Sequence, residues 1–262
     1  MEREQLRTMF EQVPEVYDRA RPTYPEELFD DLEALAGLGA GARLLEIGCG
    51  TGQATLALAR RGYTVVCVEL GAGLAAMAGR KLAPFPDVEV VNANFEAWEP
   101  ERAGFDAVVA FTALHWVDPE LRYAKPARLL RPGGCLGVGG TLHVQRPGGD
   151  SFWVEVQEDY DAVAPSEDNQ PPPTPDAVES LREEIEAGGF FEYVAWRRYL
   201  WDQPYTADEY IALLDTYSGH RALDDERRQE LYRRIRRRIE ARPDGRVTKT
   251  YLTMLNVARK AG

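Results

Sequence analysis

The first half of the chain alternates short apolar runs with segments in which apolar residues recur every three or four positions. The apolar runs predict buried strands at 44–47, 63–69, 88–91, 105–110 and 135–142, and the periodic segments predict helices at 26–38, 53–61, 72–82 and 119–130. Strands that alternate with helices in this way form a parallel sheet covered by helices. The pattern therefore predicts an α/β fold.

The regular alternation of predicted strands and helices ends after Val144. Helices are predicted at 151–164, 176–187, 206–217 and 224–241, and strands at 190–201 and 247–258. Thr206 and Glu209 have the spacing of a capping box. A proline-rich, acidic stretch over 165–175 predicts an exposed loop. At the N-terminus, residues 2–13 predict a short helix, and the prolines of 16–25 predict an ordered loop.

The first predicted strand ends in three alternate glycines, Gly48, Gly50 and Gly52, and a helix follows at once. Glycines at such a turn permit positive φ and close approach of another group. The helix that follows has unpaired N–H groups at its start, which favour polar or anionic ligands. Glu69 ends the next strand about 20 residues downstream, where an acid of a nucleotide-binding unit accepts hydrogen bonds from ribose hydroxyls.

Composition narrows the class of protein. A length of 262 residues fits one large domain, or one domain with an inserted cap. Without a long apolar run or an export signal, the sequence predicts a cytoplasmic protein with no membrane partner. The net charge of −12 argues against a long nucleic acid partner. The cysteines, at 49, 67 and 135, lack metal-ligand spacing, so we expect buried reduced thiols and no metal.

Several strings resemble those of class I S-adenosylmethionine-dependent methyltransferases. Residues 46–52 read E-I-G-C-G-T-G, with G-x-G-x-G spacing in place of the G-x-G-x-x-G of dinucleotide folds. The Y-D-x-x-R-P-x-Y-P string at 17–25, A-L-H-W at 113–116 and L-L-R-P-G-G at 129–134 resemble the trans-aconitate-type, methyltransferase type 11 subgroup that acts on small molecules. The resemblance covers about the first 140 residues.

This resemblance implies a Rossmann-like, doubly wound sheet of seven strands in the order 3-2-1-4-5-7-6, with strand 7 antiparallel and a helical cap. The whole chain, 1–262, would be one domain, with an N-terminal strap and helix at 1–38 and a cofactor-binding core at 39–143. Segments 144–175 and 202–246 would form the cap. Segments 176–201 and 247–260 would complete the sheet.

The cofactor implied is S-adenosylmethionine, with S-adenosylhomocysteine as product. Arg21 suits the cofactor carboxylate, because a guanidinium can make two parallel hydrogen bonds to it. Asn94 stands where the family commonly has Asp, and its side-chain oxygen could accept from the adenine amino group or simply cap a turn. The predicted cofactor-binding residues are Tyr17, Arg21, Glu46, Gly48, Cys49, Gly50, Gly52, Glu69, Leu70, Asn94, Phe95, Thr112 and Ala113.

The predicted acceptor pocket consists of His115, Trp116, Trp153 and Tyr217. His115 is the candidate catalytic proton acceptor, with a structural role as its alternative. Trp116 could equally belong to the core. The arginine-rich stretch 224–241 predicts a solvated helix face paired with acids such as Glu226 and Glu230, or a basic surface for an anionic partner.

The function implied is transfer of a methyl group to a small-molecule acceptor by direct in-line displacement. The methyl donor is already activated, so placement supplies much of the catalysis, and a base is needed only for a protonated acceptor. Three alternatives stay open: an RNA or protein methyltransferase, a non-catalytic S-adenosylmethionine-binding protein, and a nicotinamide dehydrogenase, which the glycine spacing disfavours. A monomer or a homodimer is expected.

Overall fold

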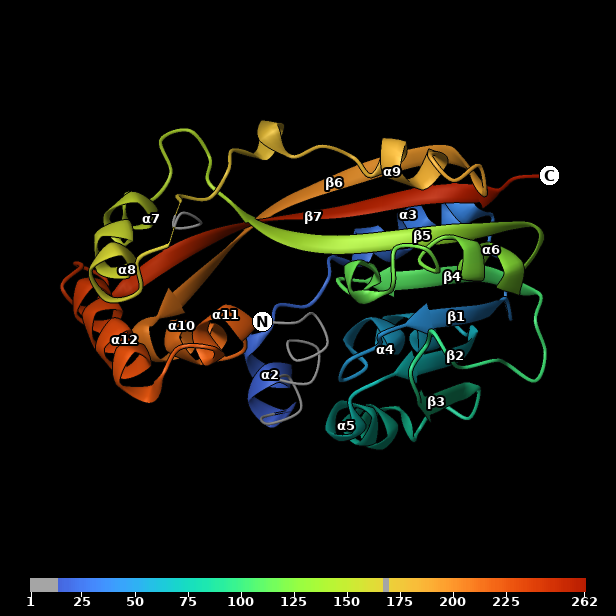
Figure 1. The fold of residues 1–262 in the computed structure, drawn as a ribbon, viewed down its shortest axis with the longest axis horizontal. Helices are drawn as coiled ribbons and strands as arrows, with labels where there is room; N and C mark the ends of the chain where they lie inside the picture. The colour runs from blue at the N-terminus through green and yellow to red at the C-terminus, as the bar shows by residue number, and fades with distance from the viewer. Residues whose placement is uncertain (1–13, 167–169) are drawn as a thin grey trace.

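The computed structural model describes residues 14–166 and 170–262, and within them a mixed sheet of seven strands runs in the order β3-β2-β1-β4-β5-β7-β6 (Figure 1). The first five strands are parallel, and β7 is antiparallel to β5 and β6. The predicted order and the antiparallel last strand are confirmed. The strands are β1 Arg43–Ile47, β2 Thr64–Glu69, β3 Val88–Asn92, β4 Phe105–Phe111, β5 Leu130–Val144, β6 Phe191–Thr206 and β7 Arg246–Lys260.

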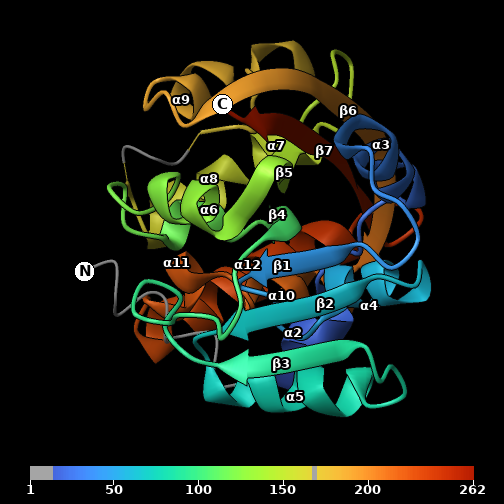
Figure 2. The same ribbon diagram turned by 90° about the vertical axis from the view of Figure 1, so that its right-hand side faces the viewer.

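Helices cover both faces of the sheet (Figure 2). One face packs on α3 Glu26–Ala36, α4 Gln53–Arg60 and α5 Ala72–Leu82, and the other on α6 Ala124–Leu129 and α9 Arg182–Glu186. Neighbouring residues such as Leu44 and Leu45 belong to opposite apolar clusters, because side chains alternate along a strand. The central strands are therefore continuous apolar runs, as the sequence predicted.

Strands β5, β6 and β7 extend beyond the other strands into a helical lobe (Figure 1). This lobe, called the cap below, contains α7 Phe152–Glu155, α8 Gln157–Val163, α10 Ala207–Leu214, α11 Ser218–Arg221 and α12 Asp225–Glu240. It has an apolar cluster of its own, in which α12 buries Leu231, Ile235 and Ile239. The predicted capping box of Thr206 and Glu209 begins α10.

The arginines of α12 lie on its exposed face, and most of them pair with acids. Arg233 and Arg234 both contact Glu230, and Arg238 bonds to Asp159 of α8. The interpretation of this stretch as a paired, solvated helix face is therefore confirmed for Glu230, whereas Arg238 pairs with the buried Asp159 of the cap.

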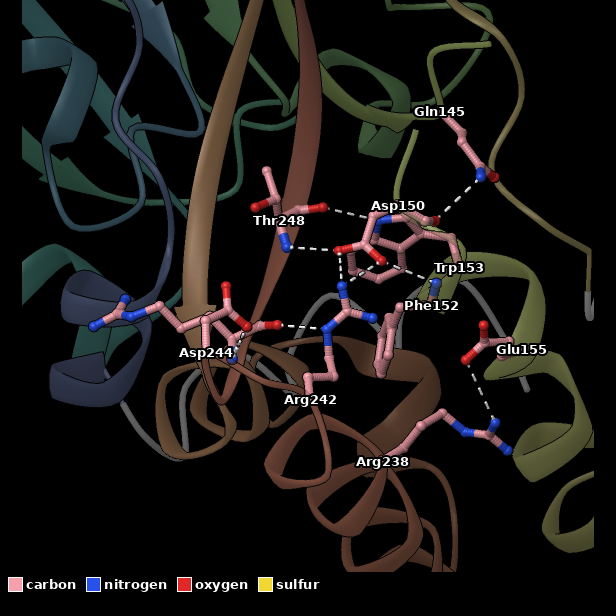
Figure 3. A network of polar contacts seen from close by, with 10 residues as sticks. Gln145, Asp150, Phe152, Trp153, Glu155, Arg238, Arg242, Asp244 and Thr248 are labelled. Atoms are coloured by element: carbon pink, nitrogen blue, oxygen red, sulfur yellow. Dashed lines mark hydrogen bonds and ion pairs between the residues drawn. The ribbon is translucent and has the colours of Figure 1, made fainter. Parts of the chain in front are cut away.

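A polar network joins the start of α7 to the turn between α12 and β7 (Figure 3). Asp150 accepts hydrogen bonds from Arg242 at 2.8 Å and from the backbone N–H of Thr248 at 3.2 Å. The indole N–H of Trp153 donates to the carbonyl oxygen of Thr248 at 2.9 Å. These bonds fasten the cap to the long strand β7.

Some predicted elements differ in the structure. The segment 16–25, predicted as a loop, is partly helical: α2 spans Pro14–Ala20, and Pro22 lies beyond its end. Helix α6 starts at Ala124 instead of 119, since Pro126 cannot donate the hydrogen bond of a longer helix. The helix predicted at 151–164 is divided into α7 and α8, and the one predicted at 176–187 is reduced to α9.

The helix predicted at 2–13 lies outside the described residues. Nothing in the part that is described forms a helix long and apolar enough to cross a membrane.

Candidate active site

A cavity of about 320 Å³ lies at the carboxyl ends of β1, β2 and β4. The strand order reverses between β1 and β4, and this is where open α/β sheets bind ligands. Its volume lies in the range of small-molecule sites. The predicted residues that line it are Arg21, Glu46, Gly48, Cys49, Gly50, Glu69, Leu70, Phe95, Thr112, Ala113, His115, Trp116 and Tyr217.

The glycine loop between β1 and α4 forms the floor of the cavity. Gly48, Gly50 and Gly52 all have positive φ, at 67°, 57° and 79°. A Cβ on Gly48 would lie 2.7 Å from Cβ of Ala113, so only glycine fits between the loop and the end of β4. Gly52 does not line the cavity; a Cβ there would meet Leu82 of α5 at 3.0 Å, so this glycine allows α4 and α5 to pack closely.

Glu69, at the end of β2, holds two loops at once. Its Oε2 accepts a hydrogen bond from the N–H of Gly50 at 2.8 Å, and its Oε1 accepts one from the N–H of Gly71 at 2.8 Å. A carboxylate oxygen can accept two hydrogen bonds. Glu69 can therefore keep these contacts and still accept from hydroxyl groups in the cavity.

Glu46, near the end of β1, is a buried acid in the cavity wall, with 1% of its surface exposed. Its Oε2 has no hydrogen-bond partner among the described residues. Burial raises the pKa of this carboxyl to about 7 despite the nearby Thr55 hydroxyl, and the charge of Glu69 adds to the shift. An orphaned carboxyl oxygen in a cavity fits a cationic ligand group.

Helix α2 is bonded to the glycine loop through Asp18. The Oδ1 of Asp18 accepts from Oγ1 of Thr51 at 2.6 Å and also pairs with Lys81 of α5. The side-chain amide of Gln53 donates to the Asp18 carbonyl at 3.1 Å. The strap predicted at the N-terminus therefore lies against the cavity, although the side chain of Tyr17 is outside what the structure describes.

Arg21 follows α2 and reaches the cap. Its Nη2 donates to the carbonyl oxygen of Thr216 at 2.9 Å, and its guanidinium lies 4.4 Å from the centre of the Tyr217 ring. The cavity thus lies between the sheet and the cap, with residues from both in its wall.

The segment after β4 contributes Thr112, Ala113, His115 and Trp116 to the cavity. Thr112 has a φ of 54°, a strained value for a β-branched residue, and its hydroxyl lies 2.9 Å from that of Tyr24. His115 is exposed on the short turn η2 Leu114–Trp116, and its ring centre lies 4.8 Å from that of Trp116. The ring is nevertheless partly desolvated where it lines the cavity, and this desolvation, with the charge of Arg122, lowers the pKa of the imidazole.

Besides Gly52, two predicted site residues, Asn94 and Trp153, lie outside the cavity wall. Asn94 accepts a hydrogen bond from the N–H of Glu96 at 2.9 Å, which is the turn-capping alternative. Trp153, predicted to line the acceptor pocket, is instead 3% exposed in the cap core, where it packs against Phe152 and Tyr210. Its indole is turned inward because its N–H bonds to β7.

Sequence reasoning missed several residues that the cavity wall includes. Tyr24, Thr51 and Gln53 fall within or directly after the recognised strings, so their position in those strings was an available signal. Ser218 comes from the cap, where no recognised string marks it.

The cysteines fit the prediction, since Cys49, Cys67 and Cys135 are all free and buried. Within the described residues, no group of three or more His, Cys, Asp or Glu side chains is placed to hold a metal ion.

Comparison with known proteins agrees with this geometry. The methyltransferase domain family matches residues 44–134, which contain the glycine loop, Glu69 and the segment after β4. Residues 44–134 are therefore a methyltransferase domain of the class I S-adenosylmethionine-dependent kind. The domain includes the strands that bound the cavity, and the cap lies outside the matched residues.

Relatives of this methyltransferase domain are similar over part of their length. An uncharacterized methyltransferase of Mycobacterium tuberculosis is 36% identical over 138 residues, 53% of this chain and 52% of that protein. The demethylmenaquinone methyltransferase of Clavibacter sepedonicus is 31% identical over 140 residues, 51% and 57% of the two chains. The chain thus spans about half the length of the curated relatives it matches.

A solved structure from Anaeromyxobacter dehalogenans, provisionally assigned as a type II methyltransferase, is similar to more of this chain. It has a TM-score of 0.64 and 25% identity, and the match covers 91% of this chain and 97% of that one. The arrangement of sheet and helices is therefore shared well beyond the matched family residues.

Proposed function

We propose that this protein binds S-adenosylmethionine in the cavity and transfers its methyl group to a small-molecule acceptor by direct displacement. The observation that carries the proposal is Glu69, whose carboxylate is bonded to the glycine loop and still lines the cavity. An acid in this place suits ribose hydroxyls, and the glycine loop leaves room for a ligand beside the backbone.

The other residues of the cavity wall would contact different groups of the cofactor. Glu46, with its unpartnered oxygen, would receive the ammonium group, and Arg21 would approach the carboxylate. Phe95 would lie against the adenine ring. The shape of the site would be set by the other wall residues, which are Gly48, Cys49, Gly50, Leu70, Thr112 and Ala113. Tyr17, Gly52 and Asn94 stay predictions from the sequence.

S-adenosylmethionine supplies a methyl group on a positively charged sulfur, so the protein need not generate an electrophile. The contribution of the chain is to align the acceptor with that methyl group and to exclude water. Alignment of this kind is worth on the order of 7–11 kcal/mol of barrier. The cap segments 144–175 and 202–246 would provide this alignment by covering the carboxyl edge of the sheet.

The wall of the cavity favours a small acceptor with apolar or aromatic character. Tyr24, Phe111, Trp116 and Tyr217 present aromatic rings there. His115 lies in the same wall and remains a candidate for contact with the acceptor. A demethylmenaquinone is a suitable first compound to test, because one relative is named for it.

The first test is calorimetric titration of the protein with S-adenosylhomocysteine, which should bind with one site per chain. The second is incubation with S-adenosylmethionine carrying a labelled methyl group and a metabolite extract, with the label expected in a small molecule. Label recovered in protein or RNA would show that the acceptor is a macromolecule and not a small molecule. Binding without any labelled product would favour a non-catalytic cofactor-binding protein, and absence of binding would refute the proposal.

A further inference from the structure

Tyr217 is the tyrosine that the described part of the cap contributes to the cavity wall, and its hydroxyl contacts a buried cation. It precedes α11, and the ammonium of Lys249 on β7 donates to its hydroxyl oxygen at 3.1 Å. Lys249 is 3% exposed. The guanidinium of Arg21 lies on the Tyr217 ring, at 4.4 Å from the ring centre.

The surroundings of Lys249 are aromatic. Its ammonium lies 5.2–5.9 Å from the ring centres of Tyr217, Tyr251, Tyr210 and Trp153. No carboxylate of residues 14–166 or 170–262 forms an ion pair with it. A buried cation is costly unless an anion or strong acceptor partners it, so this pocket favours negative charge on the Tyr217 oxygen.

The other titratable groups around Tyr217 do not supply competing charge. Burial raises the pKa of Tyr205 to about 12, and burial with the charge of Lys249 lowers the pKa of His220 to about 4. Burial also raises the pKa of Tyr160, Tyr210 and Tyr251. The nearby carboxylate of Asp215 lies 3.5 Å from the guanidinium of Arg221. Burial opposes ionisation of Tyr217 too, but Lys249 and Arg21 outweigh it and lower its pKa.

We propose that Tyr217 is the proton acceptor of the methyl transfer. Lys249, which bonds to its oxygen, and Arg21, which lies over its ring, would stabilise it as a phenolate. The inference rests on the proposed function, because it concerns the acceptor side of the same cavity. His115 is placed less well for this task, since it is more exposed than Tyr217 and its ring is not bonded to a buried ammonium as the Tyr217 hydroxyl is.

The step balances in atoms and electrons. The acceptor atom loses its proton to the Tyr217 oxygen and uses the freed electron pair to form a bond to the methyl carbon. The bond between that carbon and sulfur breaks, and its electron pair stays on sulfur as a neutral thioether. Tyr217 then releases the proton to solvent. The acceptor is accordingly a hydroxyl, a protonated amine or an acidic carbon, and not a carboxylate, which needs no base.

The decisive experiment needs no acceptor. The ultraviolet absorbance of tyrosinate is followed during a pH titration of the whole protein, which has 12 tyrosines. One tyrosine should ionise before the others in the native protein, Tyr217→Phe should remove that step, and Lys249→Met should move it to higher pH. Tyr232→Phe, in α12 away from the cavity wall, is the matched control and should leave the step in place.

The inference would be overturned if no tyrosine ionised at lower pH than the others, or if that early ionisation were still present in Tyr217→Phe. Circular dichroism and S-adenosylhomocysteine titration of every variant show whether it is folded and whether cofactor binding is intact. A protein that binds the product normally but lacks the early tyrosinate contradicts this inference alone, whereas loss of binding by the native protein contradicts the proposed function.

Once an acceptor is in hand, kinetics provide a second readout. Tyr217→Phe should lower kcat by about 10²–10⁴-fold, the usual contribution of a general base, with cofactor affinity unchanged. Lys249→Met, which acts through Tyr217, should shift the rising limb of the pH–rate profile to higher pH. An unchanged kcat in Tyr217→Phe would exclude the role.

Discussion

The carboxylate of Glu69 accepts a hydrogen bond from the backbone N–H of Gly50 at 2.8 Å. The acid that ends β2 thus holds the loop that follows β1, while its other oxygen holds Gly71 at the start of α5. One side chain therefore sets the distance between the two loops that bound the cavity, and this connects the shape of the site with its chemistry.

Replacement of Glu69 should weaken cofactor binding in two graded steps. Glu69→Ala removes charge-assisted hydrogen bonds worth about 1.5–3 kcal/mol, so we expect the Kd for S-adenosylhomocysteine to rise on the order of tenfold or more. Glu69→Gln keeps one acceptor oxygen and should have a smaller effect. Calorimetry measures both, with Glu89→Ala on the exposed side of β3 as control. An unchanged Kd in Glu69→Ala would contradict the ribose role.

Gly48→Ala should impair the site directly. The new Cβ would lie 2.7 Å from that of Ala113 at a φ of 67°, so the loop must move away from β4. We expect a loss of about 1–3 kcal/mol in stability and weaker cofactor binding. Gly79→Ala, on α5 with no atom within 4 Å of its Cβ, is the matched control and should stabilise by about 0.4–1 kcal/mol. Equal unfolding curves for the two variants would contradict the claim that only glycine fits at position 48.

The bond between Asp18 and Thr51 should appear as a coupling energy. Their side-chain oxygens are 2.6 Å apart, and the bond joins α2 to the glycine loop. In a double-mutant cycle of Asp18→Ala and Thr51→Val, denaturant unfolding should give a coupling of about 0.5–1.5 kcal/mol. Asp18→Ala alone should cost more than Thr51→Val, because Asp18 also pairs with Lys81. Strictly additive effects would mean that α2 is not fastened through this contact.

Stability should depend on pH through Glu46. Its pKa rises from 4.5 to about 7 on folding, so the folded state binds more protons than the unfolded state between these values. The contribution is full below pH 4.5 and is lost as the pH rises to 7, by as much as about 3 kcal/mol. The lowered pKa values of His143 and His220 act in the opposite direction below pH 6.5, so the loss is measured as the difference between the native protein and Glu46→Gln, which cannot ionise at this position. In thermal unfolding from pH 5 to 7.5, the stability of the native protein relative to Glu46→Gln should fall as the pH rises. A difference that does not change with pH would contradict the role of Glu46.

Much of the sheet and of the loop could be predicted from the sequence because both rest on local rules. Apolar runs of strand length, the glycine triplet and the capping box of Thr206 each act within a few residues, and the structure has them where the patterns indicate. The acid Glu69 was recognisable for the same reason, as a polar residue that ends an apolar strand.

The tertiary structure decided what distant segments do together. Arg21, Tyr217 and Lys249 meet only because α2, the cap and β7 converge, and no local pattern reports a contact across about 200 residues of chain. Packing also directs the Trp153 side chain into the cap core. Propensity and periodicity describe which side of an element is apolar, whereas the identity of its neighbour depends on the fold as a whole.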